Sequence, residues 1–303
     1  MSDEWRVLTR AELHAEGHDE PAIRRLVRHG RLQRMARGVY LEGPRASGAQ
    51  RWWQDVAVQA QLHPQATVSG QAAAAVLGLD GFDPPVPISV VAPSDRHGGA
   101  GVRRRRSVEA PLEVRGLWVT AVEDTLLTLA EDLSARPGCA AAGSPLDPFE
   151  LVELAVECAL RRELTTIERL RDAVAATTAR RPGRAVLCAV LAVRPDEPPT
   201  GSYLETRCHQ VLRAAGLPAF RRQVELHDHH GRIGTVDFAL GQVVIEVVGE
   251  RWHLERFGPD HRRYARLAAA GHRLLTFTFD DIEHQPGHVA DATGRALRTR
   301  PLC

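Results

Sequence analysis

The chain has 303 residues, more than one hydrophobic core usually supports, so two or three domains are expected. Apolar residues make up 44% of it without any run of the roughly 18 that span a bilayer, and the net charge of +1 favours no class of partner. The five cysteines include no Cys-x-x-Cys pair, which argues against a disulfide framework and a zinc ribbon, and with the polar, acidic N-terminus this predicts a cytoplasmic protein without membrane association.

The first 45 residues predict two short helices. Thr9 and Glu12 have the spacing of a capping box, which opens the first helix, and Gly17 ends it. Pro21 suits the first turn of a second helix, which ends at Gly30.

Two short strand-like runs follow, in the segment LQRMARGVYL of residues 32–41. Helix, turn, helix and wing in this order are typical of a winged-helix domain, which we place at residues 1–48. A recognition helix and wing of this kind present arginines to bases and phosphates. The predicted DNA-binding residues here are Arg24, Arg25, Arg28, Arg34 and Arg37. The alternative is an exposed helix, without a partner, in an arginine-rich protein.

This segment resembles the N-terminal domain of AbiEi-type antitoxins, the transcriptional autoregulators of type IV toxin–antitoxin systems. The matching residues are Thr9, Leu13 and the stretch GRLQRMARGVY of residues 30–40. The resemblance covers about 40 residues. It implies that the chain binds DNA as a regulator, with a cognate toxin protein as a further expected partner.

The middle of the chain, residues 49–192, predicts a mixed α/β domain whose order also resembles the antitoxin-like proteins. Predicted helices cover 71–79, 121–133, 150–162 and 165–180, and predicted strands cover 86–92 and 112–119. The run Arg103–Arg106 is either a solvated loop or a phosphate contact. The region shows no spacing typical of a nucleophile with its base or of metal ligands.

A segment rich in proline and acidic residues separates this region from the last one. It covers Ala192–Ser202, and we interpret residues 193–201 as a linker. Beyond it, residues 202–303 alternate helices with strands and predict an α/β domain with a mixed sheet. The fold class expected overall is α/β multidomain, with a winged helix, a mixed α/β middle domain and this C-terminal domain.

The stretch TVDFALGQVVIEVV predicts a hairpin that turns at Gly241, in the first central position of a type II′ turn. Residue 240 then faces 243, and 238 faces 245. Continuing the count sets Asp237 directly opposite Glu246, with their β-carbons about 4.5–5.5 Å apart. The other face is expected to be the core and consists of Val236, Phe238, Leu240, Val243, Ile245 and Val247.

Two carboxylates placed opposite each other repel, and in a shared site one pKa rises. The protein can protonate one acid, supply an arginine or bind a cation. Hard divalent ions such as Mg²⁺ take one or two carboxylates and keep several waters. A magnesium site on Asp237 and Glu246 is one interpretation, and an exposed pair neutralised by arginines is the other.

The last hundred residues resemble the small proteins that are similar to very-short-patch-repair endonucleases, which have the restriction-endonuclease-like, PD-(D/E)xK fold. The shared features are the stretches SYLE (202–205), GLP (216–218), VDF (236–238), VIEV (244–247) and RLLTFT (273–278), with Gln223, Gly249, His253, Asp260, Arg263, Leu267, Gly271 and Asp281. The resemblance implies a DNA endonuclease that hydrolyses phosphodiester bonds with Mg²⁺ or Mn²⁺ held by Asp237 and Glu246.

The resemblance also implies roles for residues around that pair. Glu205 is either a further catalytic acid or the closing residue of a capping box with Ser202. His253 matches a histidine that activates water or protonates the leaving oxygen. Arg263 binds the scissile phosphate, as a DNA-binding residue, or pairs with Asp260. The predicted catalytic residues are therefore Asp237, Glu246, His253 and Glu205.

One departure from the family pattern bears on activity. Members commonly carry an acid where this chain has Val248, so one possible metal ligand beside Glu246 is missing. The whole chain also lacks lysine, which excludes any mechanism that needs one.

Two functions remain in competition at this stage. The first is a metal-dependent DNA endonuclease brought to duplex DNA by the winged helix. The alternative is a catalytically inactive, DNA-binding regulator of the AbiEi type, in which the nuclease fold has become a binding module or a homodimer interface, in a toxin–antitoxin or phage-defence context.

Overall fold

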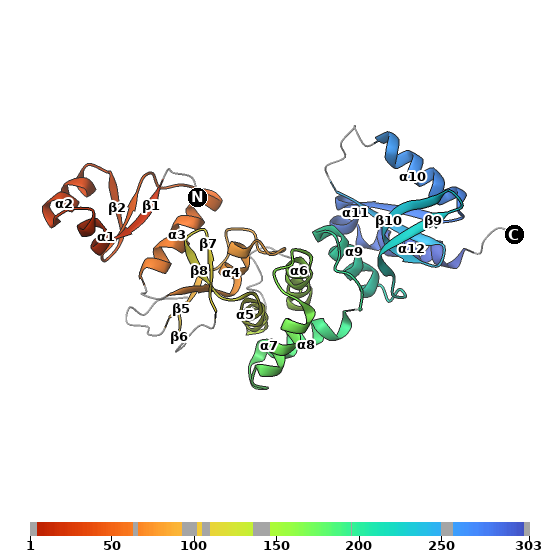
Figure 1. Cartoon of the computed structure of the whole chain (residues 1–303), viewed down its shortest axis with the longest axis horizontal. Helices are drawn as coiled ribbons and strands as arrows, with labels where there is room; N and C mark the ends of the chain where they lie inside the picture. The colour runs from red at the N-terminus through yellow and green to blue at the C-terminus, as the bar shows by residue number, and fades with distance from the viewer. Residues whose placement is uncertain are drawn as a thin grey trace. The chain divides into compact units, whose positions relative to one another are not determined.

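The computed structural model describes residues 5–62, 66–92, 102–104, 110–135, 146–194, 196–249 and 257–299. The chain divides into two compact units, drawn in Figure 1. The first comprises Met1–Ala155 and Thr165–Ala192, and the second Val156–Leu164 and Val193–Cys303. Every helix among the described residues is too short or too polar to cross a lipid bilayer. The predicted α/β multidomain class is confirmed.

The N-terminal part of the first unit has the predicted order of helix, turn, helix and wing. Its elements are β1 (Arg6–Thr9), α1 (Arg10–Ala15), α2 (Glu20–Arg28), β2 (Leu32–Ala36) and β3 (Val39–Glu42). The strands form a sheet in the order β1-β3-β2. Thr9 and Glu12 make the predicted capping box at the start of α1, and Asp19 caps α2 through the backbone N–H of Ala22.

The rest of the first unit surrounds a five-stranded mixed sheet with the order β6-β5-β4-β8-β7. The strands are β4 (Thr67–Ser69), β5 (Ser89–Ala92), β6 (Val102–Arg104), β7 (Leu112–Val114) and β8 (Leu117–Val119). The helices are α3 (Gly48–Leu62), α4 (Gly70–Leu77), α5 (Val122–Ala135), α6 (Pro148–Arg161), α7 (Ile167–Ala176) and α8 (Pro182–Val193). α4 is buried all round, and each of its residues except Gln71 is small or apolar. Of the arginine run, Arg105 and Arg106 lie outside the described residues.

The second unit contains the predicted mixed sheet, in the order β12-β11-β10-β9. Its strands are β9 (Arg221–Asp228), β10 (Gly231–Leu240), β11 (Val243–Val248) and β12 (Arg273–Thr278). Its helices are α9 (Tyr203–Ala214), α10 (Phe257–Ala269), α11 (Phe279–His284) and α12 (Pro286–Arg298), with the second half of α6. β11 pairs in parallel with β12 and antiparallel with β10.

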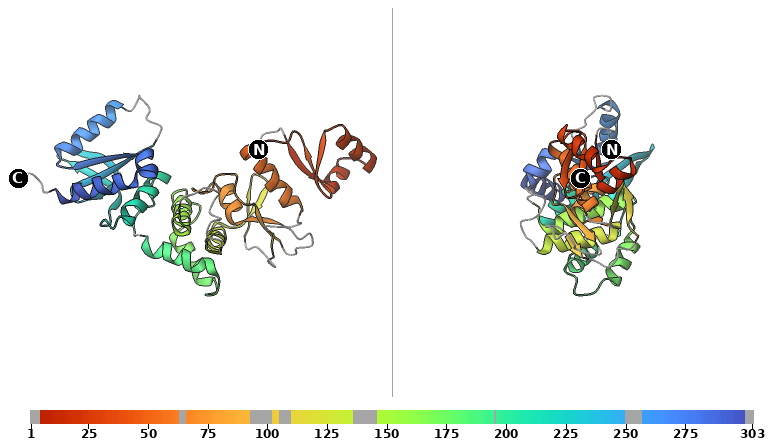
Figure 2. Two further views of the ribbon diagram at one scale, coloured as in Figure 1. Left: turned by 180° about the vertical axis from the view of Figure 1, so that it is seen from behind. Right: turned by 90° about the vertical axis from the view of Figure 1, so that its left-hand side faces the viewer.

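Helices cover both faces of this sheet, as the two views in Figure 2 show. On one face, Phe238 and Ile245 pack with apolar residues of α9, α11 and α12. On the other face, Val244 packs with Leu267 of α10. Glu246 is buried and Asp237 half-buried between these layers, so the pair does not lie on the solvated face that the exposed-pair interpretation requires.

The predicted hairpin register is confirmed for Phe238 opposite Ile245 and Leu240 opposite Val243. The ladder of β10 and β11 ends at Phe238, so it does not include the predicted pair of Asp237 and Glu246. Gly241 has a φ of +59°, as the first central residue of a type II′ turn requires. The predicted core face is wrong in one position. Val236 packs on the α10 side whereas Phe238 packs on the other, so the alternation of side chains breaks between them, next to Gln223 of β9 with its φ of +48°.

The segment predicted to be a linker is packed within the second unit. Thr200 is fully buried, and its backbone N–H donates to Glu157 of α6. Arg194 forms an ion pair with the same carboxylate. Prolines keep residues 196–199 out of regular structure. Thr200 and Arg194, on either side of them, nevertheless contact a residue far away in the sequence, as a flexible linker would not.

Replacing Phe238 with alanine should destabilise the second unit by about 3–5 kcal/mol, because the side chain is fully buried and leaves a cavity. Phe279→Ala is the control, since that ring is 36% exposed and should cost much less. Urea denaturation followed by hydrogen exchange of β10 and β11 measures both. Equal losses in the two variants would contradict this description of the core.

Candidate functional site

The second helix of the winged-helix segment exposes one basic face. Ile23 is buried in a small core with Leu13 and Leu32, and Leu26 and Val27 pack against that core. Because α2 turns every 3.6 residues, the intervening positions point to solvent. These positions hold the predicted arginines of α2.

The exposed arginines of the helix and wing have no carboxylate partner in the part of the chain that the structure describes. They are Arg24, Arg25, Arg28, Arg31, Arg34 and Arg37. By contrast, Arg6 forms ion pairs with Glu16 and Glu42, and Arg10 pairs with Glu20. The acidic residues of this segment thus neutralise the arginines near β1 and leave the face of α2 and the wing positively charged. Such a face attracts polyanions.

The second unit gathers three acids at the junction of α9, β10 and β11. Glu205 and Glu246 are each 8% exposed, and Asp237 is half-buried. Glu205 stands in the first turn of α9, where Ser202 Oγ accepts a hydrogen bond from its backbone N–H. The structure thus brings together three of the four predicted catalytic residues. The fourth, His253, lies outside the described residues.

The capping box predicted for Ser202 and Glu205 forms only in part. The carboxylate of Glu205 accepts from the backbone N–H of Gly201 at 2.5 Å. A box would require the N–H of Ser202 instead. A β-carbon at Gly201 would lie 2.8 Å from Glu205 Oε1, so a larger residue there would require the Glu205 carboxylate to shift.

Gln223 links two of the acids, a role that the sequence analysis missed. Its Nε2 donates to Glu205 Oε2 at 2.7 Å and to Asp237 Oδ1 at 3.4 Å. The other oxygen of Asp237 accepts from the backbone N–H of Val247 at 2.7 Å. The positive φ of Gln223 is a strained conformation for a residue with a side chain. The only signal for it was its place in the endonuclease resemblance.

The third acid is held by an arginine. Arg263 Nη1 lies 2.8 Å from Glu246 Oε1 and donates to the backbone carbonyl of Thr235, also at 2.8 Å. Sequence analysis proposed a phosphate or Asp260 as the partner of Arg263. The structure places Glu246 against Arg263, because α10 packs over the face of the sheet on which Glu246 lies. The side chain of Asp260 lies outside what the structure describes.

Burial dominates the electrostatics of this cluster. It raises the pKa of Glu205 to about 7, and the nearby carboxylate of Asp237 acts in the same direction. Burial also raises the pKa of Glu246 to about 7, against the opposing effect of Arg263. The pKa of Asp237 is raised by burial too, and the hydrogen bond from Val247 opposes the rise. Such shifts are common at functional sites and also occur in structural clusters.

The cluster in this arrangement does not fit a metal ion. Among the described residues, no three His, Cys, Asp or Glu side chains are placed to hold one. Gln223 and a backbone N–H donate to the oxygens of Asp237. Arg263 forms an ion pair with the buried Oε1 of Glu246, which accepts no hydrogen bond among the described residues. Val248 contributes no ligand. A cation at Asp237 and Glu246 would require the Arg263 contact to open.

Comparison with known proteins bears on the N-terminal segment. Residues 2–43 match the family model described as "Transcriptional regulator, AbiEi antitoxin". The predicted AbiEi resemblance is confirmed there. The endonuclease resemblance of residues 202–303 stays a prediction.

Other similarities cover only parts of the chain. Uncharacterized proteins MT2308 and Rv2248, from two strains of Mycobacterium tuberculosis, are each 30% identical to it over 103 residues, which is 32% of this chain. The chain spans 37% of the length of those relatives. The crystal structure of the RV2827C protein from M. tuberculosis matches with a TM-score of 0.37 at 20% identity, over 63% of this chain and 77% of that chain.

The raised pKa of Glu205 predicts how stability depends on pH. Because the folded state holds this proton more tightly than the unfolded chain does, its contribution is full below about pH 4.5 and is lost as pH rises towards 7. Glu205→Gln should therefore flatten the fall in melting temperature between pH 5 and 7.5, measured without added metal.

Glu225→Gln is the matched control. This exposed carboxyl on β9 has a lowered pKa because Arg232 donates to it, so its removal should leave that fall in place. A wild-type melting temperature that does not fall over this range, or an identical fall in Glu205→Gln, would show that Glu205 is not a buried acid.

Proposed function

We propose that this protein is a DNA-binding transcriptional regulator of the AbiEi antitoxin type. The observation that supports the proposal most is the set of exposed arginines on α2 and the wing, which no carboxylate of the described residues neutralises, within the segment that matches the AbiEi model. A winged helix inserts its recognition helix into the major groove and lays the wing along the backbone.

The arginines have distinct tasks in this proposal. Those of α2 reach base edges and nearby phosphates, and Arg34 and Arg37 of the wing contact the phosphate backbone. Phosphate contacts supply affinity that depends on salt, whereas base contacts supply sequence preference. The predicted toxin partner and homodimer belong to the same proposal, since antitoxin regulators act through a promoter and a cognate toxin.

Removing the arginines of α2 should abolish specific binding. The triple variant Arg24→Ala, Arg25→Ala, Arg28→Ala should lose at least about tenfold in affinity for duplex DNA carrying the protein's own promoter. The slope of log K against log salt should become shallower by about 0.9 for each phosphate that an arginine no longer neutralises. Gel retardation or fluorescence anisotropy over a salt series measures both quantities.

The control removes the same charge elsewhere. Arg171, Arg180 and Arg295 are exposed and lie far along the sequence from the winged helix. Their combined replacement with alanine should change the affinity less than threefold. If both triple variants bind DNA as the wild type does, the proposed interface is wrong.

A metal-dependent DNA endonuclease is the second candidate function. The observation that favours it is the gathering of Glu205, Asp237 and Glu246, buried and with raised pKa values, at the position the endonuclease resemblance implies. The ion pair of Arg263 with Glu246 and the apolar side chain at Val248 favour the regulator. Mg²⁺ or Mn²⁺ is the cofactor that this candidate requires.

A plasmid assay separates the two candidates. The endonuclease predicts nicking or linearisation in Mg²⁺ or Mn²⁺ that Glu246→Ala abolishes while DNA binding persists. The exposed Glu225 provides the control, and Glu225→Ala should cut as the wild type does. The regulator predicts no cleavage in any divalent metal and unchanged promoter retardation in Glu246→Ala.

A further inference from the structure

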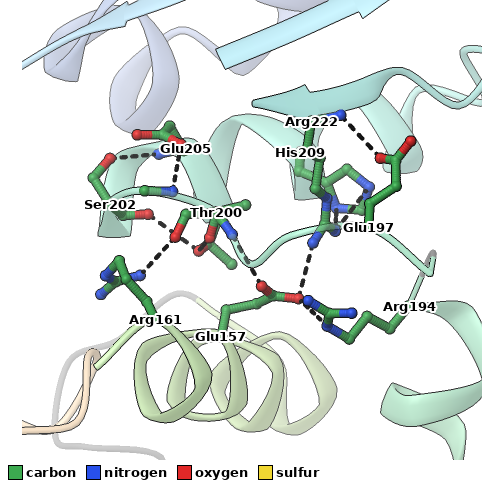
Figure 3. Close-up of polar contacts among 11 residues, drawn as sticks. Glu157, Arg161, Arg194, Glu197, Thr200, Ser202, Glu205, His209 and Arg222 are labelled. Atoms are coloured by element: carbon green, nitrogen blue, oxygen red, sulfur yellow. Dashed lines mark hydrogen bonds and ion pairs between the residues drawn. The ribbon is translucent and has the colours of Figure 1, made fainter. Parts of the chain in front are cut away.

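A buried carboxylate outside the predicted site connects several parts of the second unit. The side chain of Glu157, on the second half of α6, is 1% exposed. Its Oε1 lies 2.9 Å from Arg222 Nη1 and 3.0 Å from Arg194 Nε. Its Oε2 accepts from the backbone N–H of Thr200 at 3.1 Å. Figure 3 shows these contacts converging on the one carboxylate.

Two of these partners stand next in sequence to the groups that hold Glu205. Thr200 precedes Gly201, whose N–H donates to Glu205 Oε2. Arg222 precedes Gln223, whose Nε2 donates to the same oxygen. Glu157 therefore binds the residue immediately before each donor, through the backbone N–H of Thr200 and through the guanidinium of Arg222.

The backbone at Gln223 needs such support. Its positive φ is strained, and strained residues persist only where the surroundings determine their conformation. The guanidinium of Arg222, whose side chain is 1% exposed, provides an anchor one residue away. A second tie is the backbone N–H of Arg222, which donates to Glu197 at 2.9 Å.

Within the described part of the chain, no other acid pairs with the buried guanidinium of Arg222. The side chain of His209 also lies against it, with Nδ1 and Nε2 at 3.2 and 3.3 Å from Arg222 Nη2. Burial, and then the positive charge of Arg222, lower the pKa of His209 to about 3. The imidazole is therefore neutral and does not balance the charge of the Arg222 guanidinium. Glu197 is engaged by the backbone of Arg222.

We propose that Glu157 is a positioning residue of the carboxylate cluster. It holds Thr200 and Arg222 at a fixed spacing, and through them it places the two donors on Glu205. If Glu157 is removed, the guanidinium of Arg222 must leave the interior or find water, because an unpaired buried charge is unstable. The backbone before Gly201 and Gln223 then moves, and the hydrogen bond between Gln223 and Glu205 breaks. The proposal requires neither a bound metal nor nuclease activity.

The test follows the side-chain amide of Gln223 in the full-length protein. In ¹⁵N-labelled protein its NH₂ signal is assigned by its disappearance in Gln223→Met. A hydrogen-bonded, half-buried amide exchanges slowly with water, so the rate of exchange reports the contact with Glu205. Glu157→Ala should accelerate it at least tenfold. Glu157→Asp keeps the charge but shortens its reach, and it should accelerate exchange severalfold.

The matched control breaks another ion pair of the same unit. Arg207 Nε lies 3.1 Å from Glu283 Oε1, and both side chains are largely buried. Glu283→Ala should leave exchange at Gln223 within twofold of the wild type.

Two results would overturn the proposal. One is an unchanged exchange rate at Gln223 in the folded Glu157 variants, with Glu157→Asp deciding alone if Glu157→Ala does not fold. The other is an equal acceleration of exchange at Gln223 in Glu283→Ala, which would show that the effect comes from a general loss of stability.

Discussion

Buried charge is the constraint on which the second unit depends. Glu157 and Arg222 are both removed from water, and such groups are tolerated only when they are paired and hydrogen-bonded. Their pairing joins α6 to β9, and the residues beside them hold Glu205. In the cluster, Arg263 forms an ion pair with Glu246, although the buried Oε1 of Glu246 accepts no hydrogen bond among the described residues. Each acid of the cluster thus has a protein partner in this arrangement, and the proposal of a regulator rests in part on that observation.

The winged-helix segment shows the opposite use of charge. Glu16 and Glu42 pair with Arg6, and Glu20, at the start of the second helix, pairs with Arg10. The face of α2 is left positively charged and exposed. Exposed charges remain hydrated, so they destabilise the fold little, and they attract a polyanionic partner. One chain thus neutralises buried charges internally in one unit and presents exposed positive charge in the other, and this contrast underlies the proposal of a DNA-binding regulator.

Sequence reasoning succeeded where local patterns decide the structure. The capping box of Thr9 and Glu12, the wing turning at Gly38 and the hairpin turning at Gly241 depend on neighbours in the chain, and each is confirmed. It failed where distant residues decide. The break in alternation that turns Val236 to the α10 side depends on packing between elements, and so do the contacts of Gln223 with Glu205 and Asp237. Glu157 is 65 positions from Arg222, so no spacing in the sequence points to that pair.

The claim that the N-terminal arginines form the DNA interface is tested most directly by hydrogen exchange on the full-length protein. Backbone amides should be compared with and without duplex DNA from the protein's own promoter. The account predicts slower exchange in α2 and in the wing formed by β2 and β3, with β9 to β11 unchanged. Protection confined to β9, β10 and β11, with none in the winged helix, would contradict it.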